Sequence, residues 1–226
     1  MPEPSAVIRG DFDRIALVSG ETWNSNDHYH PFLLRQLPAR FRKALEIGCG
    51  TGAFSRLLAA RADGVTGIDL SPQMIRLARE RSAGFTNIDY QTADILDWPW
   101  PAGGYDCIAA IATLHHLPLE TVLGRCAAAL STGGTLLVLD LYKAESAADY
   151  LAGGLAFPVS AVLRLAHTGR LRDPRAVREA WAQHGNHEQY STLSQIRAVC
   201  ARVLPGASVR RHLIWRYSIV WRKKEL

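Results

Sequence analysis

Short apolar segments alternate with amphipathic ones through the middle of the chain. The apolar segments predict strands over 44–48, 64–69, 88–92, 105–111 and 134–141. The amphipathic segments predict helices over 52–61, 72–83 and 119–130. Ser71 and Pro72 mark the start of the second helix, because serine caps a helix N-terminus and proline suits the first turn. This alternation predicts an α/β fold with a parallel sheet and helices on both faces.

The alternation stops after residue 142. Helices are predicted over 157–166 and 174–181, separated by Gly169 and by Asp173-Pro174. The region of about 143–188 is therefore expected to be a helical insertion.

The last part of the chain predicts a helix followed by strands. Thr192 and Gln195 have the spacing of a capping box, and Pro205-Gly206 stops the helix. From Val209 to Trp221 apolar residues alternate with largely polar or basic ones. This period of two predicts one or two half-buried strands.

Residues 1–40 are predicted to form an N-terminal extension or cap in front of a domain over 41–226. Their central segment, 23–31, is rich in polar and aromatic residues rather than in periodic apolar ones. The leucines that follow predict a short helix ended by Pro38.

The composition is that of one globular domain, with 226 residues of which 48% are hydrophobic. No apolar run approaches the ~20 residues of a membrane helix, and the N-terminus lacks the basic and apolar regions of a secretory signal. The cysteines are scattered, with no C-x-x-C pair, at Cys49, Cys107, Cys126 and Cys200. A reduced, cytoplasmic location is expected.

Positive charge gathers late in the chain, which has a formal net charge of +5. Much of it lies between Arg197 and Lys224. It either attracts an acidic substrate or nucleic acid, or belongs to a solvated sheet edge that arginine and lysine keep from aggregating. The edge is favoured, and a monomer or homodimer is expected.

A glycine-rich turn follows the first strand, and an acid ends the second. The turn contains Gly48, Gly50 and Gly52, which allow a ligand to approach the backbone closely. Asp69 is placed to bind the two hydroxyls of a ribose. Glu46, just before the turn, repels a pyrophosphate but attracts an ammonium or sulfonium group. The pattern favours a positively charged nucleoside over a dinucleotide.

From about Arg42 to Tyr142 the chain resembles the class I S-adenosylmethionine-dependent methyltransferases. The segments that carry the resemblance are LEIGCGTG (45–52), GIDLSPQM (67–74), ADI (93–95) and LHHL (114–117) followed by LSTGGTL (130–136). The resemblance implies a Rossmann-like, doubly wound, mostly parallel seven-stranded sheet with an antiparallel terminal hairpin. It also implies that the helical insertion is a lid over the substrate, whereas packing on the sheet edge is the alternative.

The resemblance implies S-adenosylmethionine as cofactor and S-adenosylhomocysteine as product. The residues expected to face the methionine part are Tyr29, Glu46, Gly48, Cys49, Gly50, Ala112 and Thr113. Asp69 is expected to hold the ribose. The residues expected along the adenine are Leu70, Met74, Ala93, Asp94 and Ile95. Leu70 and Met74 are otherwise core residues, and Asp94 is otherwise a turn or cap residue.

Candidates for a general base are His115, His116 and His28, because imidazole titrates near neutral pH. The alternative for the His115-His116 pair is a structural role. No metal site is expected, because the histidines are scattered. Nucleic acid is not expected as the acceptor, because the Asn/Asp-Pro-Pro-aromatic run of nucleic-acid N-methyltransferases is missing after the fourth strand.

The expected activity is methyl transfer to an oxygen, nitrogen or carbon atom of a small molecule. The alternatives are a methyltransferase-like binding or regulatory subunit and a nicotinamide-dependent reductase. Phe157 and Trp181 suggest an apolar or aromatic acceptor. Four arginines of the insertion suggest an acidic group on that acceptor: Arg164, Arg170, Arg172 and Arg175.

Overall fold

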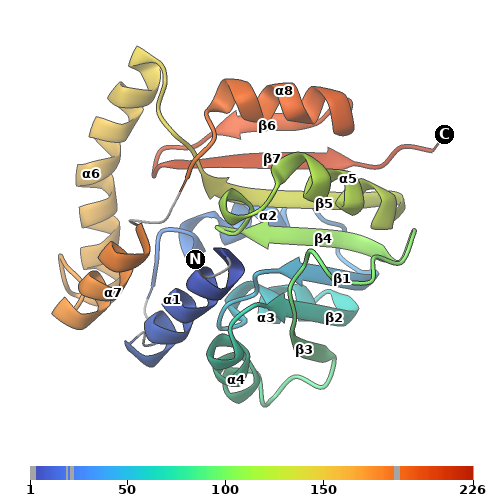
Figure 1. The fold of residues 1–226 in the computed structure, drawn as a ribbon, viewed down its shortest axis with the longest axis horizontal. Helices are drawn as coiled ribbons and strands as arrows, with labels where there is room; N and C mark the ends of the chain where they lie inside the picture. The colour runs from blue at the N-terminus through green and yellow to red at the C-terminus, as the bar shows by residue number, and fades with distance from the viewer. Residues whose placement is uncertain (1–3, 19, 21–22, 186–188, 226) are drawn as a thin grey trace.

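The computed structural model describes residues 4–18, 20, 23–185 and 189–225. In these residues seven strands form one sheet (Figure 1). The strands are β1 (Phe41–Ile47), β2 (Ala62–Asp69), β3 (Ile88–Thr92), β4 (Tyr105–Ile111), β5 (Leu130–Leu141), β6 (Ser208–Arg211) and β7 (Arg216–Arg222). Their order is β3-β2-β1-β4-β5-β7-β6, and β7 runs antiparallel to both of its neighbours. The predicted mostly parallel fold with an antiparallel terminal hairpin is confirmed.

The two central strands, β4 and β5, are apolar on both faces. Ile108, Ala109 and Ala110 are fully buried, and so are residues 136–139. Such continuous apolar runs are typical of parallel strands that helices cover on both sides. One side packs against α5 (Leu119–Ala129) and α8 (Leu193–Val203), and the other against α2 (His30–Leu34) and α3 (Ala53–Ala59).

Two helices begin at the caps that the sequence predicts. The Ser71 hydroxyl accepts a hydrogen bond from the Met74 backbone N–H at 3.1 Å, at the start of α4 (Pro72–Arg81). At the start of α8, Thr192 and Gln195 form a reciprocal capping box. These caps satisfy N–H groups that have no partner within the helix.

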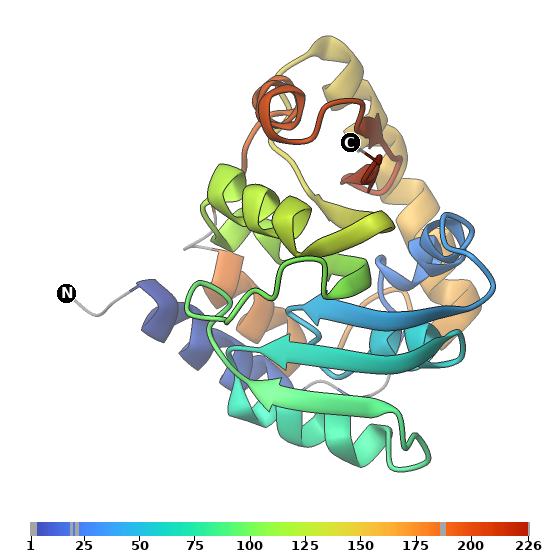
Figure 2. The same cartoon turned by 90° about the vertical axis from the view of Figure 1, so that its right-hand side faces the viewer.

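The first helix, α1 (Pro4–Val18), was not predicted from the sequence. It packs against α4 and α7 (Arg175–Gly185) at one end of the sheet (Figure 2). Asp13 in α1 accepts a hydrogen bond from the Ser71 hydroxyl at 2.5 Å, which ties the helix to the start of α4. Ile8, Phe12 and Ile15 have helical spacing, and this stripe is the signal that the sequence analysis missed.

The insertion contains a longer helix than predicted, α6 (Ala147–Thr168). It begins at a capping box between Ser146 and Asp149, and the Arg211 guanidinium donates to the Asp149 carboxylate at 2.8 Å. These contacts hold the pKa of Asp149 at about 2, below its usual value.

One helix among the described residues, α6, has the length and composition of a membrane span. Its apolar window has a mean hydropathy of 1.2, and 6% of that window is buried. The expectation that no apolar run approaches this length is therefore corrected. Length and composition alone are weak evidence for a membrane span, and α6 runs alongside the domain in Figure 1.

Candidate functional site

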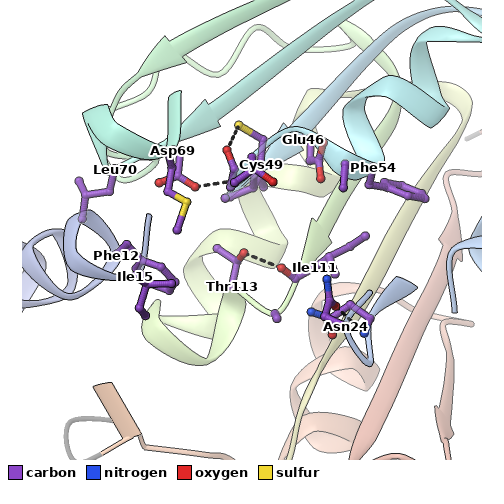
Figure 3. A pocket seen from close by; sticks show the side chains of 18 of the residues that line it. Phe12, Ile15, Asn24, Glu46, Cys49, Phe54, Asp69, Leu70, Ile111 and Thr113 are labelled. Carbon is purple, nitrogen blue, oxygen red and sulfur yellow. Dashed lines mark hydrogen bonds between the residues drawn. The ribbon is translucent and has the colours of Figure 1, made fainter. Parts of the chain in front are cut away.

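A cavity of about 1540 Å³ lies at the carboxyl ends of β1, β2 and β4, and side chains of α1 and α7 complete its wall. Open α/β sheets bind ligands at this edge. Predicted binding residues that line the cavity are Glu46, Gly48, Cys49, Gly50, Asp69, Leu70, Met74, Ala93, Asp94, Ile95, Ala112 and Thr113. The fold therefore gathers distant sequence segments around one space (Figure 3).

The turn after β1 needs glycine at two positions for different reasons. Gly48 has a φ of +65°, and a Cβ there would lie 2.2 Å from the Thr113 hydroxyl oxygen. Gly50 has a φ of +51°, but a Cβ there would meet nothing within 4 Å. Gly48 is thus required for packing against the end of β4, whereas Gly50 leaves open space in which a ligand can approach the backbone.

Asp69, the last residue of β2, is held by two backbone groups. Its carboxylate oxygens accept hydrogen bonds from Gly50 N–H and Ser71 N–H, both at 2.9 Å. Burial raises the pKa of Asp69 to about 6, although the backbone donors oppose this shift. The two N–H groups fix the carboxylate beside the glycine turn, and its remaining lone pairs are available to hydroxyl groups of a ligand.

Glu46, near the end of β1, is almost completely buried, with 2% of its surface exposed. Burial raises the pKa of this carboxyl group to about 8, and the Ser55 hydroxyl, which donates to it, lowers the pKa less. The nearby Asp69 charge raises the pKa further. A cation entering the cavity would stabilise the charged form of both acids.

The cavity extends to the turn that follows β3, at Asp94. The Asp94 carboxylate accepts a hydrogen bond from Leu96 N–H at 2.8 Å, so this residue does stabilise a turn. Asp94 also lines the cavity, together with Ala93 and Ile95. The turn and ligand interpretations of Asp94 are therefore compatible.

The end of β4 has an unusual backbone. Ala112 has a φ of +51°, a conformation that costs a residue with a Cβ free energy. Its N–H donates to Leu139 C=O at 2.7 Å, and the Thr113 hydroxyl donates to Ile111 C=O at 3.0 Å. These contacts hold the chain in a sharp turn that faces the glycine turn of β1 (Figure 3).

Three predicted residues do not line the cavity in the described structure: Tyr29, His28 and His115. The Tyr29 hydroxyl accepts a hydrogen bond from Ile214 N–H at 3.0 Å, and His28 packs edge-on against the Tyr29 ring. His115 lies beside Asp140 with Nδ1 2.6 Å from a carboxylate oxygen. By contrast, His116 does line the cavity.

The arrangement of Tyr29 predicts an effect on stability and not on ligand binding. Changing Tyr29 to phenylalanine leaves the buried Ile214 N–H without its acceptor, which should cost about 1–3 kcal/mol of unfolding free energy. Chemical denaturation and calorimetric titration with S-adenosylhomocysteine measure the two effects. Tyr150→Phe, at an exposed position of α6, is the control and should change neither. If Tyr29→Phe bound S-adenosylhomocysteine more weakly without any loss of stability, Tyr29 would have to contribute to the ligand site.

The sequence analysis missed the wall that faces the glycine turn. Phe12 and Ile15 of α1 line it, together with Asn24, His30 and Phe54. Figure 3 shows Phe12 and Ile15 across the cavity from Cys49. The helical stripe of α1 carries a signal for the first two, and His30 belongs with His28 and Tyr29 to a polar and aromatic cluster for which cofactor contact is expected from the sequence, whereas no local pattern links Asn24 to a ligand.

The insertion contributes fewer residues than predicted. Trp181 and Arg164 line the cavity, and Arg164 pairs with Asp173. Phe157 does not line it, because the ring packs edge-on against Trp215 and is 68% exposed. Three of the four arginines that the sequence predicts near the acceptor do not line the cavity either: Arg170, Arg172 and Arg175. Arg178 lines the cavity and was not predicted.

The chain is similar in sequence to known methyltransferases. The model of the methyltransferase domain family matches residues 44–134. An uncharacterised methyltransferase of Mycobacterium tuberculosis (strain ATCC 25618 / H37Rv) is 29% identical over 209 residues, which are 89% of this chain and 98% of that protein. A demethylmenaquinone methyltransferase of Tropheryma whipplei (strain Twist) is 35% identical over 143 residues, 60% of this chain and 59% of that protein.

Solved structures with a similar fold also include methyltransferases. The crystal structure of the N-methyltransferase NodS from Bradyrhizobium japonicum WM9, in complex with S-adenosylhomocysteine, has a TM-score of 0.62 at 17% identity. The similarity covers 99% of this chain and 100% of that one. The sheet order is that of a Rossmann-like fold, and its cavity lies at the glycine-rich turn after β1. The matching domain family, the methyltransferase relatives and the shared fold together support a class I S-adenosylmethionine-dependent methyltransferase.

Proposed function

We propose that the protein transfers the methyl group of S-adenosylmethionine to an oxygen, nitrogen or carbon atom of a small molecule and releases S-adenosylhomocysteine. The observation that carries this proposal is the pair of carboxyl groups beside the glycine turn, the buried Glu46 and the half-buried Asp69. Glu46 attracts the ammonium end of the cofactor, and Asp69 accepts from the ribose hydroxyls.

The other cavity residues support the same orientation. Leu70, Met74 and Ile95 offer apolar surface to the adenine, and Asp94 is an acceptor for its amino group. Main-chain oxygens at the turn of Ala112 and Thr113, which line the cavity, are proposed to contact the methionine end. This assignment leaves the methyl group directed toward the wall formed by α1 and α7.

Methyl transfer from a sulfonium group needs little acid–base catalysis. A lone pair of the acceptor attacks the methyl carbon while the carbon–sulfur bond breaks, and the sulfur keeps the bonding electrons. Because the positive charge on sulfur disappears in this step, alignment and exclusion of water contribute most. Phe12, Ile15 and Trp181 supply the apolar wall that excludes water.

The acceptor is proposed to be an apolar or aromatic molecule with an acidic group. The apolar wall suits its rings or chains, and Arg178 in α7 suits its charge. Two relatives support this class by name, a ubiquinone biosynthesis O-methyltransferase and a demethylmenaquinone methyltransferase. The working compartment is proposed to be the cytoplasm, because all four cysteines are buried and free.

Calorimetry and a labelled-methyl assay test the proposal. The protein should bind S-adenosylhomocysteine with measurable heat at micromolar concentration, and NADH is the control ligand that should not bind. Incubation with methyl-labelled S-adenosylmethionine and a panel of phenols and hydroquinones should then label at least one acceptor. Absence of heat at millimolar S-adenosylhomocysteine, or binding of NADH instead, would contradict the assignment.

A further inference from the structure

Three imidazoles from two elements meet at the cavity wall. His115 and His116 lie in η2 (Leu114–His116), which follows β4, and His184 lies in α7. One potential ligand atom from each lies within 4.8 Å of those of the other two. The ring centroids of His115 and His116 are 3.9 Å apart, and those of His116 and His184 are 5.0 Å apart. The sequence gives no hint of this cluster, because α7 is distant in the chain.

Two of the imidazoles are oriented by buried carboxylates. His115 Nδ1 lies 2.6 Å from an Asp140 oxygen, and His184 Nδ1 lies 3.2 Å from an Asp11 oxygen. All four side chains are at most 4% exposed. A carboxylate beside Nδ1 keeps the proton on that nitrogen and leaves the lone pair on Nε2. Carboxylate–histidine pairs of this kind orient and strengthen metal-binding imidazoles.

The local charge also suits a cation. Asp140 is fully buried. Its carboxylate accepts hydrogen bonds from the backbone N–H groups of His115, at 3.0 Å, and Leu141, at 2.8 Å. Within the described part of the chain, no lysine or arginine pairs with Asp140. A buried carboxylate is costly without a positive partner. A divalent ion bound to the three imidazoles would supply the positive charge that Asp140 needs, because one of them, His115, contacts this carboxylate.

We propose that His115, His116 and His184 bind a divalent transition-metal ion, with zinc as the best match. Three histidines and one open position are the ligand set of catalytic zinc sites. Nitrogens around a tetrahedral zinc lie ~3.3 Å apart for zinc–nitrogen bonds of about 2.0–2.1 Å, so ligand atoms that lie within 4.8 Å of one another approach by up to about 1.5 Å when the ion binds.

The open position has a role that rests on the proposed function. His116 lines the substrate cavity, so an ion bound to it is next to the acceptor. An acceptor oxygen is the ligand that fits there, and coordination lowers the pKa of a hydroxyl group. The hydroxyl proton leaves to water, and the resulting oxyanion is a better nucleophile for the methyl group.

Cobalt(II) is the probe for the site, because it replaces zinc and its visible absorption reports coordination. Metal-free protein is titrated with cobalt chloride alone, and one equivalent should produce an intense visible band that zinc then removes. His116→Gln and His184→Gln should each weaken cobalt binding at least tenfold. His167→Gln is the matched control, because that histidine stacks on Trp23 outside the cluster; it should titrate like the wild type.

Asp11→Asn keeps all three ligands and tests the positioning role of the carboxylate. It should weaken cobalt binding by roughly 10-fold or more while the protein remains folded by circular dichroism. No band in the wild type, or unchanged titrations of both His184→Gln and Asp11→Asn, would show that the imidazoles only pack together. S-adenosylhomocysteine affinity, measured on the same samples, tests the proposed function separately, because its cofactor residues are outside the cluster.

Discussion

Changing Asp69 to alanine should weaken S-adenosylhomocysteine binding by roughly 10- to 100-fold, since a hydrogen bond to a charged group contributes about 1.5–3 kcal/mol. The loss has two sources. The ribose hydroxyls lose their acceptor, and Gly50 N–H and Ser71 N–H lose the carboxylate that fixes the turn. Calorimetric titration measures the change in affinity.

The control for Asp69 is Asp63, an exposed aspartate in the same strand β2. Asp63→Ala should leave the affinity for S-adenosylhomocysteine unchanged. Thermal unfolding of both variants separates loss of binding from loss of structure. An Asp69→Ala protein that binds with wild-type affinity would remove this residue from the ligand site.

Changing Glu46 to glutamine should stabilise the ligand-free protein, and more so at higher pH. The pKa of Glu46 is raised by burial from 4.5 to about 8, so the folded state holds its proton more tightly than the unfolded state does. Above pH 4.5 the unfolded state releases this proton and the folded state does not, so folding stability falls as the pH rises toward 8. Glutamine removes this contribution.

The stability gain from Glu46→Gln should be about 2–3 kcal/mol larger at pH 7 than at pH 5, from 1.36 kcal/mol per pKa unit. Urea denaturation at the two pH values measures it. Glu80→Gln in α4 is the control, because Glu80 is exposed and pairs with Arg76. It should show the pH dependence of the wild type. Equal pH dependence in Glu46→Gln and the wild type would contradict the buried, protonated carboxyl group.

Glu46 also links ligand binding to pH. A cofactor ammonium group favours the charged carboxylate, so binding should release a proton, and affinity of the wild type should rise between pH 6 and pH 8. The Glu46→Gln protein should bind more weakly and with a smaller pH dependence. The same substitution thus increases stability and reduces binding, which is the trade-off expected of a functional charge.

The sequence predicted the half of the site that depends on local motifs. Glu46, Gly50 and Asp69 were identified because a strand followed by a glycine turn fixes their positions over a few residues. The sheet order brings the parallel strands β1 and β2 side by side, so Glu46 and Asp69, near the ends of these strands, lie at the same edge of the sheet. These residues lie where the motif interpretation placed them, on the cavity.

The opposite wall could not be predicted, because contacts between distant segments build it. Asp11 meets His184, and Phe12 packs with the same histidine at a ring distance of 4.7 Å. No short-range spacing encodes either pair. Tyr29 is the opposite case: the polar and aromatic segment predicts ligand contact, whereas in the structure its hydroxyl accepts a hydrogen bond from Ile214 N–H and the residue does not line the cavity.

The position of α1 has a consequence for how the site is made during synthesis. This helix precedes the strands in the chain, but its partner α7 is synthesised only after the parallel strands β1 to β5. The strand ends that carry Glu46 and Asp69 can therefore assemble while the side of α1 that faces α7 is still uncovered. A nascent chain halted before α7 should hold the nucleoside half of the site open to water, and the enclosed reaction space is completed late in translation.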